Sequence, residues 1–232
     1  MTISVNNRKK STEKSFDELV HDLKHSNSEK VRYNAARILG EKGDFNAVEP
    51  LIDVLKNDKN GSVRLYAARA LGELGDVNAT VPLIESLRLD RNVDVRVRAA
   101  RALGRLGGEI VVEPLVEALN DENPQVCITA TEALIEIGDV ATDALIESLT
   151  HEKVNVRCDA TRALGEIGNP KCVDKIIEML KDEWVNVRIY AVTSLGKLND
   201  KKAVPALIEV MKNEKENDLV RAGAAAALGV LR

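Results

Sequence analysis

The chain has 232 residues, of which 44% are hydrophobic, 30% are charged and only 3% are aromatic. Its 33 basic and 37 acidic residues give a formal net charge of −4, which excludes a strongly basic nucleic-acid-binding protein. The ample apolar content excludes a disordered tail, and the length suits one or two ordinary domains or one extended repeat array.

The first 14 residues form a polar N-terminal segment that lacks the apolar core of a signal peptide. No apolar run in the chain approaches the roughly 18 residues that a membrane span needs, so no membrane contact is expected. The three cysteines are odd in number and include no Cys-x-x-Cys spacing, which argues against a disulfide framework or a thiolate zinc site. Reduced thiols and a cytoplasmic location are the simplest interpretation.

Residues 15–232 consist of seven copies of one motif, which predict a single domain built from repeats. The clearest copies read VRLYAARALGELG from Val63, VRVRAARALGRLG from Val95 and VRCDATRALGEIG from Val156. Weaker copies begin at Val31, Val126, Val187 and Val220, so that successive copies are 30 to 33 residues apart. The expected repeat units are about 15–43, 44–75, 76–107, 108–138, 139–168, 169–199 and 200–232, with residues 1–14 outside them.

Each unit is predicted to contain two helices, which we call helix A and helix B. In helix A of the second unit, Val48, Leu51, Ile52 and Leu55 have the i, i+3, i+4, i+7 spacing of one apolar helix face. Helix B is formed by the thirteen-residue motif itself. One helix pair cannot bury its apolar face alone, so consecutive pairs must stack and share a core.

Several residues mark helix ends and helix contacts. Ser15 and Glu18 have the spacing of a capping box at the start of the first helix A. Motif position 13, such as Gly75, is glycine in five copies and predicts a helix C-terminus. Motif position 10, such as Gly72, is glycine in six copies, although glycine inside a helix costs up to ~1 kcal/mol relative to alanine. We therefore expect position 10 to approach a neighbouring helix closely.

The angular positions along helix B, at ~100° per residue, separate a core side from an exposed side. Motif positions 1, 5, 9 and 12 are expected in the core, whereas positions 3, 4, 7 and 11 form an exposed strip that we call the helix B ridge. The ridge combines tyrosine and arginine with aliphatic residues, a composition typical of interfaces; the alternative is a tolerated surface without a partner. The predicted partner-binding residues are Tyr33, Arg37, Leu65, Tyr66, Arg69, Val97, Arg98, Arg101, Arg105, Ile128, Glu132, Arg162, Ile189 and Tyr190.

A second repeated pattern pairs basic with acidic residues. Motif position 2 is arginine at Arg32, Arg64, Arg96, Arg157, Arg188 and Arg221, and Asp58, Asp90, Asp121 and Asp182 lie five residues before the motif valine. One interpretation is an anion-binding track. The favoured interpretation is a structural ladder of charge-assisted hydrogen bonds between neighbouring loops, because the pairing repeats with the fold.

Three isolated features carry weaker signals. His21 and His25 have the i, i+4 spacing of two metal ligands, but they lie opposite the apolar face of their helix without an evident third ligand, so no metal is expected. Cys158 is expected on the ridge together with Thr129, without a histidine to activate it. Trp184 is either a binding anchor or, as we favour, an aromatic side chain that fills a space between repeats. No catalytic residue and no cofactor is assigned.

The motif Val-Arg-x-x-Ala-Ala-x-x-Leu-Gly-x-Leu-Gly, followed by Ala-Val-x-Pro-Leu-Ile, resembles the HEAT-like repeat family named after phycocyanobilin (PBS) lyases. The resemblance implies an all-α fold, a right-handed α-α superhelix (HEAT-like α-solenoid) of seven helix pairs, with helix B on the concave side. The chain departs from the pattern at Cys127, where the motif has arginine, at Ile135, where it has glycine, and at Lys42, where it has leucine.

The favoured function is a non-catalytic scaffold or adaptor that binds a partner protein on the concave helix B face. A lyase-like or tetrapyrrole-handling accessory protein is the alternative, which the resemblance alone suggests. Nucleic-acid binding is least favoured, because the basic edge of Arg98, Arg101 and Arg105 is followed by Glu132 and Glu136 in an acidic chain. The alanine-rich last helix also suggests self-association through the C-terminal end of the array.

Overall fold

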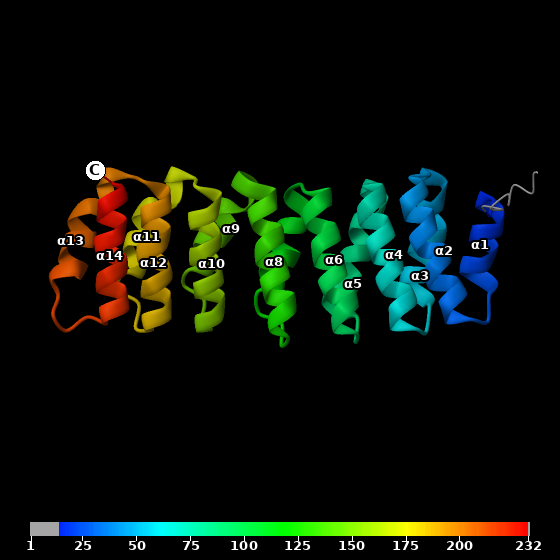
Figure 1. Ribbon diagram of the computed structural model, residues 1–232, viewed down its shortest axis with the longest axis horizontal. Helices are drawn as coiled ribbons and strands as arrows, with labels where there is room; N and C mark the ends of the chain where they lie inside the picture. The colour runs from blue at the N-terminus through cyan, green and yellow to red at the C-terminus, as the bar shows by residue number, and fades with distance from the viewer. Residues whose placement is uncertain (1–13, 232) are drawn as a thin grey trace, which may run out of the picture.

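A computed structural model of the chain describes residues 14–231, which form an elongated array of α-helices stacked side by side (Figure 1). Residues 1–13, which make up nearly all of the predicted polar N-terminal segment, and Arg232 lie outside the described residues. The helices are α1 (Phe16–His25), α2 (Glu29–Lys42), α3 (Val48–Asn57), α4 (Gly61–Leu74), α5 (Thr80–Leu89), α6 (Val93–Leu106), α7 (Val112–Ala118), α8 (Pro124–Ile137), α9 (Thr142–Ser148), α10 (Val154–Ile167), α11 (Val173–Met179), α12 (Val185–Leu198), α13 (Val204–Lys212) and α14 (Asp218–Val230).

The helices alternate between two rows, with the odd-numbered helices as helix A and the even-numbered helices as helix B. The even-numbered helices form the front row in Figure 1, where α14 covers part of α13. Each even-numbered helix packs along the next one, whereas successive odd-numbered helices touch one another only sparsely. The predicted all-α superhelix of seven helix pairs is confirmed. Within residues 14–231, no helix is both long enough and apolar enough to cross a bilayer.

The helix ends follow the predicted signals. The Glu18 N–H donates to the Ser15 hydroxyl at 3.2 Å and the Ser15 N–H donates to the Glu18 carboxylate at 2.8 Å, which completes the predicted capping box. Helix α4 ends at Gly75, whose φ of 70° lies in the left-handed region that glycine adopts without strain. A 3₁₀ turn precedes every helix A after α1. The sequence pattern predicts only a polar loop at these positions.

The core lies between the two rows and consists of thin layers of small aliphatic side chains. The four predicted core positions of the second unit, Val63, Ala67, Leu71 and Leu74, are all buried. Small aliphatic side chains fill these layers without aromatic rings. Phe45, for example, lies at the surface with 61% of its area exposed. Burial of such a layer requires the neighbouring unit, so the stability of the array is a sum over neighbouring contacts.

The glycine at motif position 10 allows the close helix contact that was predicted. A Cβ added at Gly72 would lie 2.7 Å from the Cβ and 2.9 Å from the Cα of Ala102 on the next helix. The same contact joins Gly104 to Ala133, with a distance of 2.8 Å between the added Cβ and the alanine Cβ. The partner at motif position 8, where these alanines lie, was not predicted. A larger residue at either position would force the two helices apart.

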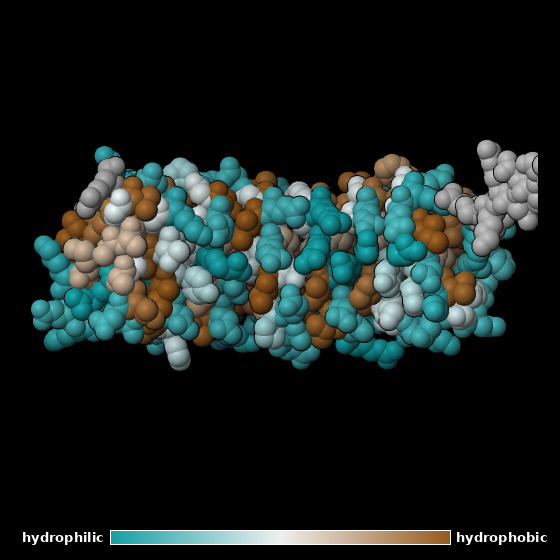
Figure 2. Space-filling model, viewed as in Figure 1, coloured by the Kyte–Doolittle hydropathy of each residue, from teal (hydrophilic) through white to brown (hydrophobic). Residues whose placement is uncertain are grey.

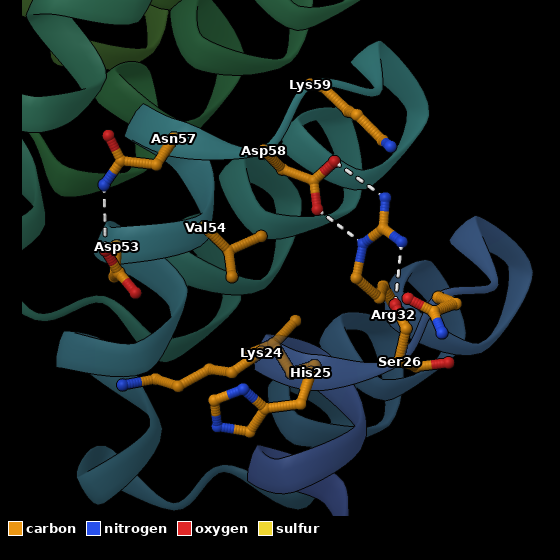
Figure 3. Close-up of a pocket in the computed structure, with 11 residues that line it drawn as sticks. Lys24, His25, Ser26, Arg32, Asp53, Val54, Asn57, Asp58 and Lys59 are labelled. Atoms are coloured by element: carbon orange, nitrogen blue, oxygen red, sulfur yellow. Dashed lines mark hydrogen bonds and ion pairs between the residues drawn. The ribbon is translucent and has the colours of Figure 1, made fainter.

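The predicted arginine–aspartate ladder is present. Arg32 donates from Nε and Nη2 to the two carboxylate oxygens of Asp58 at 2.6 and 3.0 Å, and from Nη1 to the carbonyl oxygen of Ser26 at 2.9 Å (Figure 3). One guanidinium thereby ties together the loops of two consecutive units, and we call each such pair a rung. Further rungs are Arg64–Asp90, Arg96–Asp121 and Arg157–Asp182, and Arg188–Glu216 is a similar pair.

In the rungs, burial and ion pairing have opposite effects on the pKa of the aspartate. Burial of Asp58 acts to raise the pKa of its carboxyl group, but hydrogen bonds from Arg32 and from the Asn60 N–H lower the pKa on balance. The side chains of Arg32 and Asp58 are each 8% exposed. The rungs are therefore buried, bidentate ion pairs that belong to the fold, which supports the structural interpretation of this pattern.

The joint between α8 and α10 departs from this scheme. Cys127 replaces the rung arginine and donates through Sγ to the carbonyl oxygen of Asp121 at 3.3 Å, while His151 occupies the position of the rung aspartate. Ile135 replaces the glycine at motif position 10, opposite Ala163. Helix α8 packs less closely against α10 than against α6, and a cavity of about 750 Å³ lies between α7 and α9 beside His151.

Candidate partner-binding surface

The fourteen predicted partner-binding residues all lie on even-numbered helices, and each is exposed or half-buried. Two other ridge positions are different. Thr129 is 1% exposed and Cys158 is 9% exposed, so the expectation that they lie on the exposed ridge is wrong. Both side chains are short, and neighbouring helices of the row approach closely enough to cover them. The Thr129 hydroxyl is satisfied by the carbonyl oxygen of Gln125 at 2.9 Å.

Burial also determines the chemistry of the cysteines. It raises the pKa of the Cys158 thiol to about 11, with a further contribution from the charge of Asp159. Burial likewise raises the pKa of Cys172 to about 11. Because the thiolate is the nucleophilic form, both side chains are unreactive at neutral pH. Cys158 therefore contributes to packing and not to the chemistry of the surface.

Two tyrosines of the ridge lie against each other. The rings of Tyr33 on α2 and Tyr66 on α4 have centroids 5.1 Å apart and an interplanar angle of 19°, which is a stacked arrangement. Both rings are half-buried, so they present an ordered aromatic surface with hydroxyl groups at its edge. Tyr190 on α12 is 37% exposed and lies on the same row of helices, several units away.

Four predicted arginines come together beside this tyrosine pair. Arg69 on α4 and Arg98, Arg101 and Arg105 on α6 line one small pocket of about 130 Å³. Figure 2 shows strongly hydrophilic side chains gathered over α6 on this face of the molecule. Glu73 also lines the pocket. We call these four arginines the arginine cluster.

The pairing within the arginine cluster is incomplete. Arg69 is paired with Glu73 at 2.7 Å, and Arg101 has a long contact of 3.8 Å with Glu132 on α8. The buried Nε of Arg98 has no hydrogen-bond partner among residues 14–231. Burial lowers the pKa of Arg98, and the charges of Arg101, Arg69 and Arg105 lower it further. The cluster therefore holds excess positive charge that the described part of the chain does not neutralise.

The remaining ridge is less basic. Arg37 pairs with Glu41 at 2.7 Å, Arg162 lies 3.6 Å from Asp159, and Lys197 pairs with Glu166. At the C-terminal end, the outer side of α14 is alanine-rich, and Leu219 and Val230 are 68% and 62% exposed. Nine of the fourteen predicted site residues thus lie on the neighbouring helices α2, α4 and α6. The other five lie further along the row: Ile128 and Glu132 on α8, Arg162 on α10, and Ile189 and Tyr190 on α12.

The other candidate sites offer less. A pocket of about 360 Å³ between the first loops is shown in Figure 3, where Arg32 and Asp58 are paired in the rung and Asn57 donates to Asp53. The rings of His21 and His25 lie 5.1 Å apart, and residues 14–231 contain no group of three or more potential metal ligands. Trp184 is 52% exposed, so the expectation that it fills a space between repeats is wrong; its backbone precedes α12 and its ring faces outward.

Comparison with known proteins places these features in a family. Over 98% of its length, the chain resembles the complex of CpcE and CpcF of phycocyanin lyase from Nostoc sp. PCC7120, with 26% identity, 92% of that chain covered and a TM-score of 0.55. It also resembles the archaeal HEAT-like repeats protein from Thermococcus onnurineus NA1, with 17% identity, coverages of 95% and 99% and a TM-score of 0.57. A comparison with curated proteins gives no match.

The family model for HEAT repeats matches residues 16–92, 80–154 and 142–229, which together span nearly all of the described helices. The stacked pairs, the buried core positions and the loop geometry agree with this match. The chain belongs to the HEAT repeat family.

Proposed function

We propose that the protein is a non-catalytic scaffold that binds a partner protein on the exposed face of α2, α4 and α6. The observation that carries this proposal is the juxtaposition of the stacked Tyr33–Tyr66 pair with the arginine cluster on one face. Tyrosine and arginine dominate the energetics of protein interfaces, because both combine a large contact area with directional hydrogen bonds. Aliphatic ridge residues such as Leu65 and Val97 add apolar area between them.

The packing of the two rows supports a concave position for this face. The even-numbered helices pack closely, whereas the odd-numbered helices touch only sparsely. In a superhelix, the row with the shorter spacing lies on the inner side, and solenoids use such surfaces to hold extended partners. The three unpaired cysteines, two of them buried, are consistent with a cytoplasmic location. The division into residues 1–14 and one domain of residues 15–232 stays a prediction.

The test is affinity capture from the native cell with the double variant Tyr66→Ala, Arg101→Glu, with captured proteins identified by mass spectrometry. A true partner is retained by the unmodified chain and lost by this variant at unchanged thermal stability. The matched control is Phe45→Ala, Arg91→Glu, which removes another aromatic ring and reverses another arginine charge at exposed positions outside the helix B ridge. A partner that the ridge variant retains as well as the control does would refute the proposal.

A second candidate is a lyase-like or tetrapyrrole-handling accessory function, which the 26% identity to the phycocyanin lyase complex favours. The two candidates differ in a simple optical property. A chromophore-handling protein purified from its native cell, or mixed with a bilin, acquires visible absorbance that co-elutes with it. The scaffold proposal expects no such absorbance.

We also propose that the alanine-rich face of α14 takes part in self-association. Leu219 and Val230 leave exposed apolar area there, beside Ala222 and Ala226. Light scattering of the unmodified chain and of a Val230→Glu variant tests this proposal. A concentration-dependent mass that the variant lacks is expected, and a strictly monomeric mass at high concentration would refute it.

A further inference from the structure

We propose that the arginine cluster of Arg69, Arg98, Arg101 and Arg105 binds a phosphate group carried by a segment of the partner protein. The inference rests on the proposed function, because it assigns the chemistry that the partner presents to this face. Three observations support it: the departure of α6 from the repeat, the unpaired charge of Arg98, and the charge and size of the pocket.

Helix α6 loses an acidic residue that its neighbours possess. Motif position 11 is glutamate at Glu41, Glu73, Glu136 and Glu166, but it is basic at Arg105 and at Lys197, of which Lys197 pairs with Glu166. Arg37 and Arg69 each pair with the glutamate four residues later, whereas the residue four after Arg101 is Arg105. Like charges at the i, i+4 spacing destabilise a helix. The fold gains nothing from this reversal, because Arg105 has no ion pair among residues 14–231.

Arg98 adds an unpaired charge to the pocket. Its guanidinium group forms no ion pair among residues 14–231, and it lies in a pocket lined by three further guanidinium groups. Motif position 4 is tyrosine in two other units and arginine in this unit alone. An oxyanion in the pocket supplies the missing negative charge and accepts hydrogen bonds from the guanidinium groups that line it.

Charge and size favour phosphate over a carboxylate. Four arginines and Glu73 line the pocket, and a phosphate monoester carries about −1.5 to −2 charges and three acceptor oxygens. A carboxylate offers one charge and two oxygens, so it satisfies fewer of the planar donor pairs that arginine presents. The volume of about 130 Å³ is several times the ~30 Å³ share of one water molecule, which leaves room for a phosphate group.

The surroundings favour a single phosphate on a protein segment over a nucleic acid. Beyond α6 the ridge continues with Glu132, Glu136 and Asp159, which repel a continuous chain of phosphates. On the other side lies the Tyr33–Tyr66 pair, with Leu65 nearby. A peptide with apolar side chains next to its phosphorylated residue complements both features, and arginine clusters are a recurrent mode of phosphopeptide recognition.

The first experiment measures the thermal unfolding of the unmodified chain in inorganic phosphate and in chloride of equal ionic strength. A ligand that binds the folded state alone raises the melting temperature. We expect phosphate to raise the melting temperature of the unmodified chain and of Arg88→Gln, which removes a paired arginine of α5 outside the helix B ridge. We expect no such rise in Arg98→Met or in Arg105→Gln. Equal responses of all four proteins, or of none, would overturn the proposal.

The second experiment identifies the source of the phosphate by fluorescence anisotropy. The probes are a short peptide with one phosphoserine between leucines, its serine and glutamate counterparts, and a single-stranded oligodeoxynucleotide. We expect the phosphopeptide to bind most tightly, with an affinity loss of about tenfold or more in Arg98→Met and Arg105→Gln and none in Arg88→Gln. Equal binding of the glutamate peptide, or tighter binding of the oligonucleotide, would overturn it.

The two proposals fail in different ways. If the capture experiment finds no partner while the cluster variants lose phosphate binding, the phosphate site stands and the scaffold function fails. If a partner is captured through the ridge but phosphate binds equally to the unmodified chain and Arg98→Met, the scaffold function stands and the phosphate site fails.

Discussion

Helices α6 and α8 are neighbours in the same row, and they depart from the repeat in opposite ways. Helix α6 keeps the rung of Arg96 and the close contact of Gly104, but it changes its exposed side at Arg98 and Arg105. Helix α8 keeps a mixed exposed side but changes its joint with α10, where Cys127 and Ile135 replace the rung arginine and the glycine.

The difference separates binding from stability. In a solenoid each unit is stabilised mainly by its neighbours, so a change in one joint weakens the array locally. A change on the ridge leaves every joint intact. Helix α6 therefore combines regular contacts to its neighbours with a changed exposed side, as expected of a binding element. The α8–α10 joint is the most weakly packed contact between consecutive even-numbered helices within residues 14–231.

Acidification has the largest expected effect, because it removes several rungs at once. Burial acts to raise the pKa of Asp58, Asp90 and Asp182, but their arginine partners and backbone N–H donors lower it below the ordinary value of 3.8 on balance. Their stabilising contribution is therefore present above pH 3.8 and is lost as the pH falls through the folded-state pKa. Urea unfolding at decreasing pH should show this loss, and a stability that stays constant below pH 3.8 would contradict it.

Removal of one rung is the next largest effect. Arg96→Ala leaves the carboxylate of Asp121, whose side chain is 12% exposed, without its bidentate partner. We expect a loss of about 3 to 5 kcal/mol in the free energy of unfolding and an unchanged affinity for the partner. The matched change at the irregular joint, Cys127→Ala, removes only a weak Sγ hydrogen bond. If urea unfolding gives equal losses of unfolding free energy for the two variants, the regular and the irregular joint do not differ in stability as proposed.

A smaller effect is expected when a regular joint receives the residue of the irregular one. Gly72→Ile places a branched side chain where even a Cβ would lie 2.7 Å from Ala102, and overpacking of this kind costs about 1 to 3 kcal/mol. Gly229→Ile is the matched control, because a Cβ there meets no atom within 4 Å. Thermal unfolding should show a loss for Gly72→Ile alone; a loss of the same size for Gly229→Ile would contradict a role of the close helix contact.

Repair of the irregular joint should stabilise the array modestly. Cys127→Arg together with His151→Asp restores both members of a rung, and we expect a gain of about 1 kcal/mol, close to the net value of ordinary hydrogen bonds. Either substitution alone lacks its partner and should give no gain. Hydrogen exchange of the α8 and α10 amides measures the effect locally. Faster exchange in the double variant would show that the wider spacing set by Ile135 prevents the rung from closing.

Most of the fold could be predicted because the motif repeats seven times. Each motif position therefore occurs in several copies, which show the residue types that it requires. The core valines, the rungs and the close approach at Gly72 all follow from residues that recur in register. The sequence could not show that Thr129 and Cys158 are covered, because that depends on the spacing between neighbouring helices. Convergence of arginines from α4 and α6 on one pocket depends on the same spacing.

The thermal unfolding of Arg98→Met tests most directly whether the arginines of α6 serve binding at the expense of stability. Methionine keeps an unbranched apolar side chain and removes a charge whose buried Nε has no partner among residues 14–231. We predict a melting temperature above that of the unmodified chain, equivalent to about 1 kcal/mol. A lower melting temperature would mean that the fold itself needs Arg98, which contradicts its assignment to a binding site.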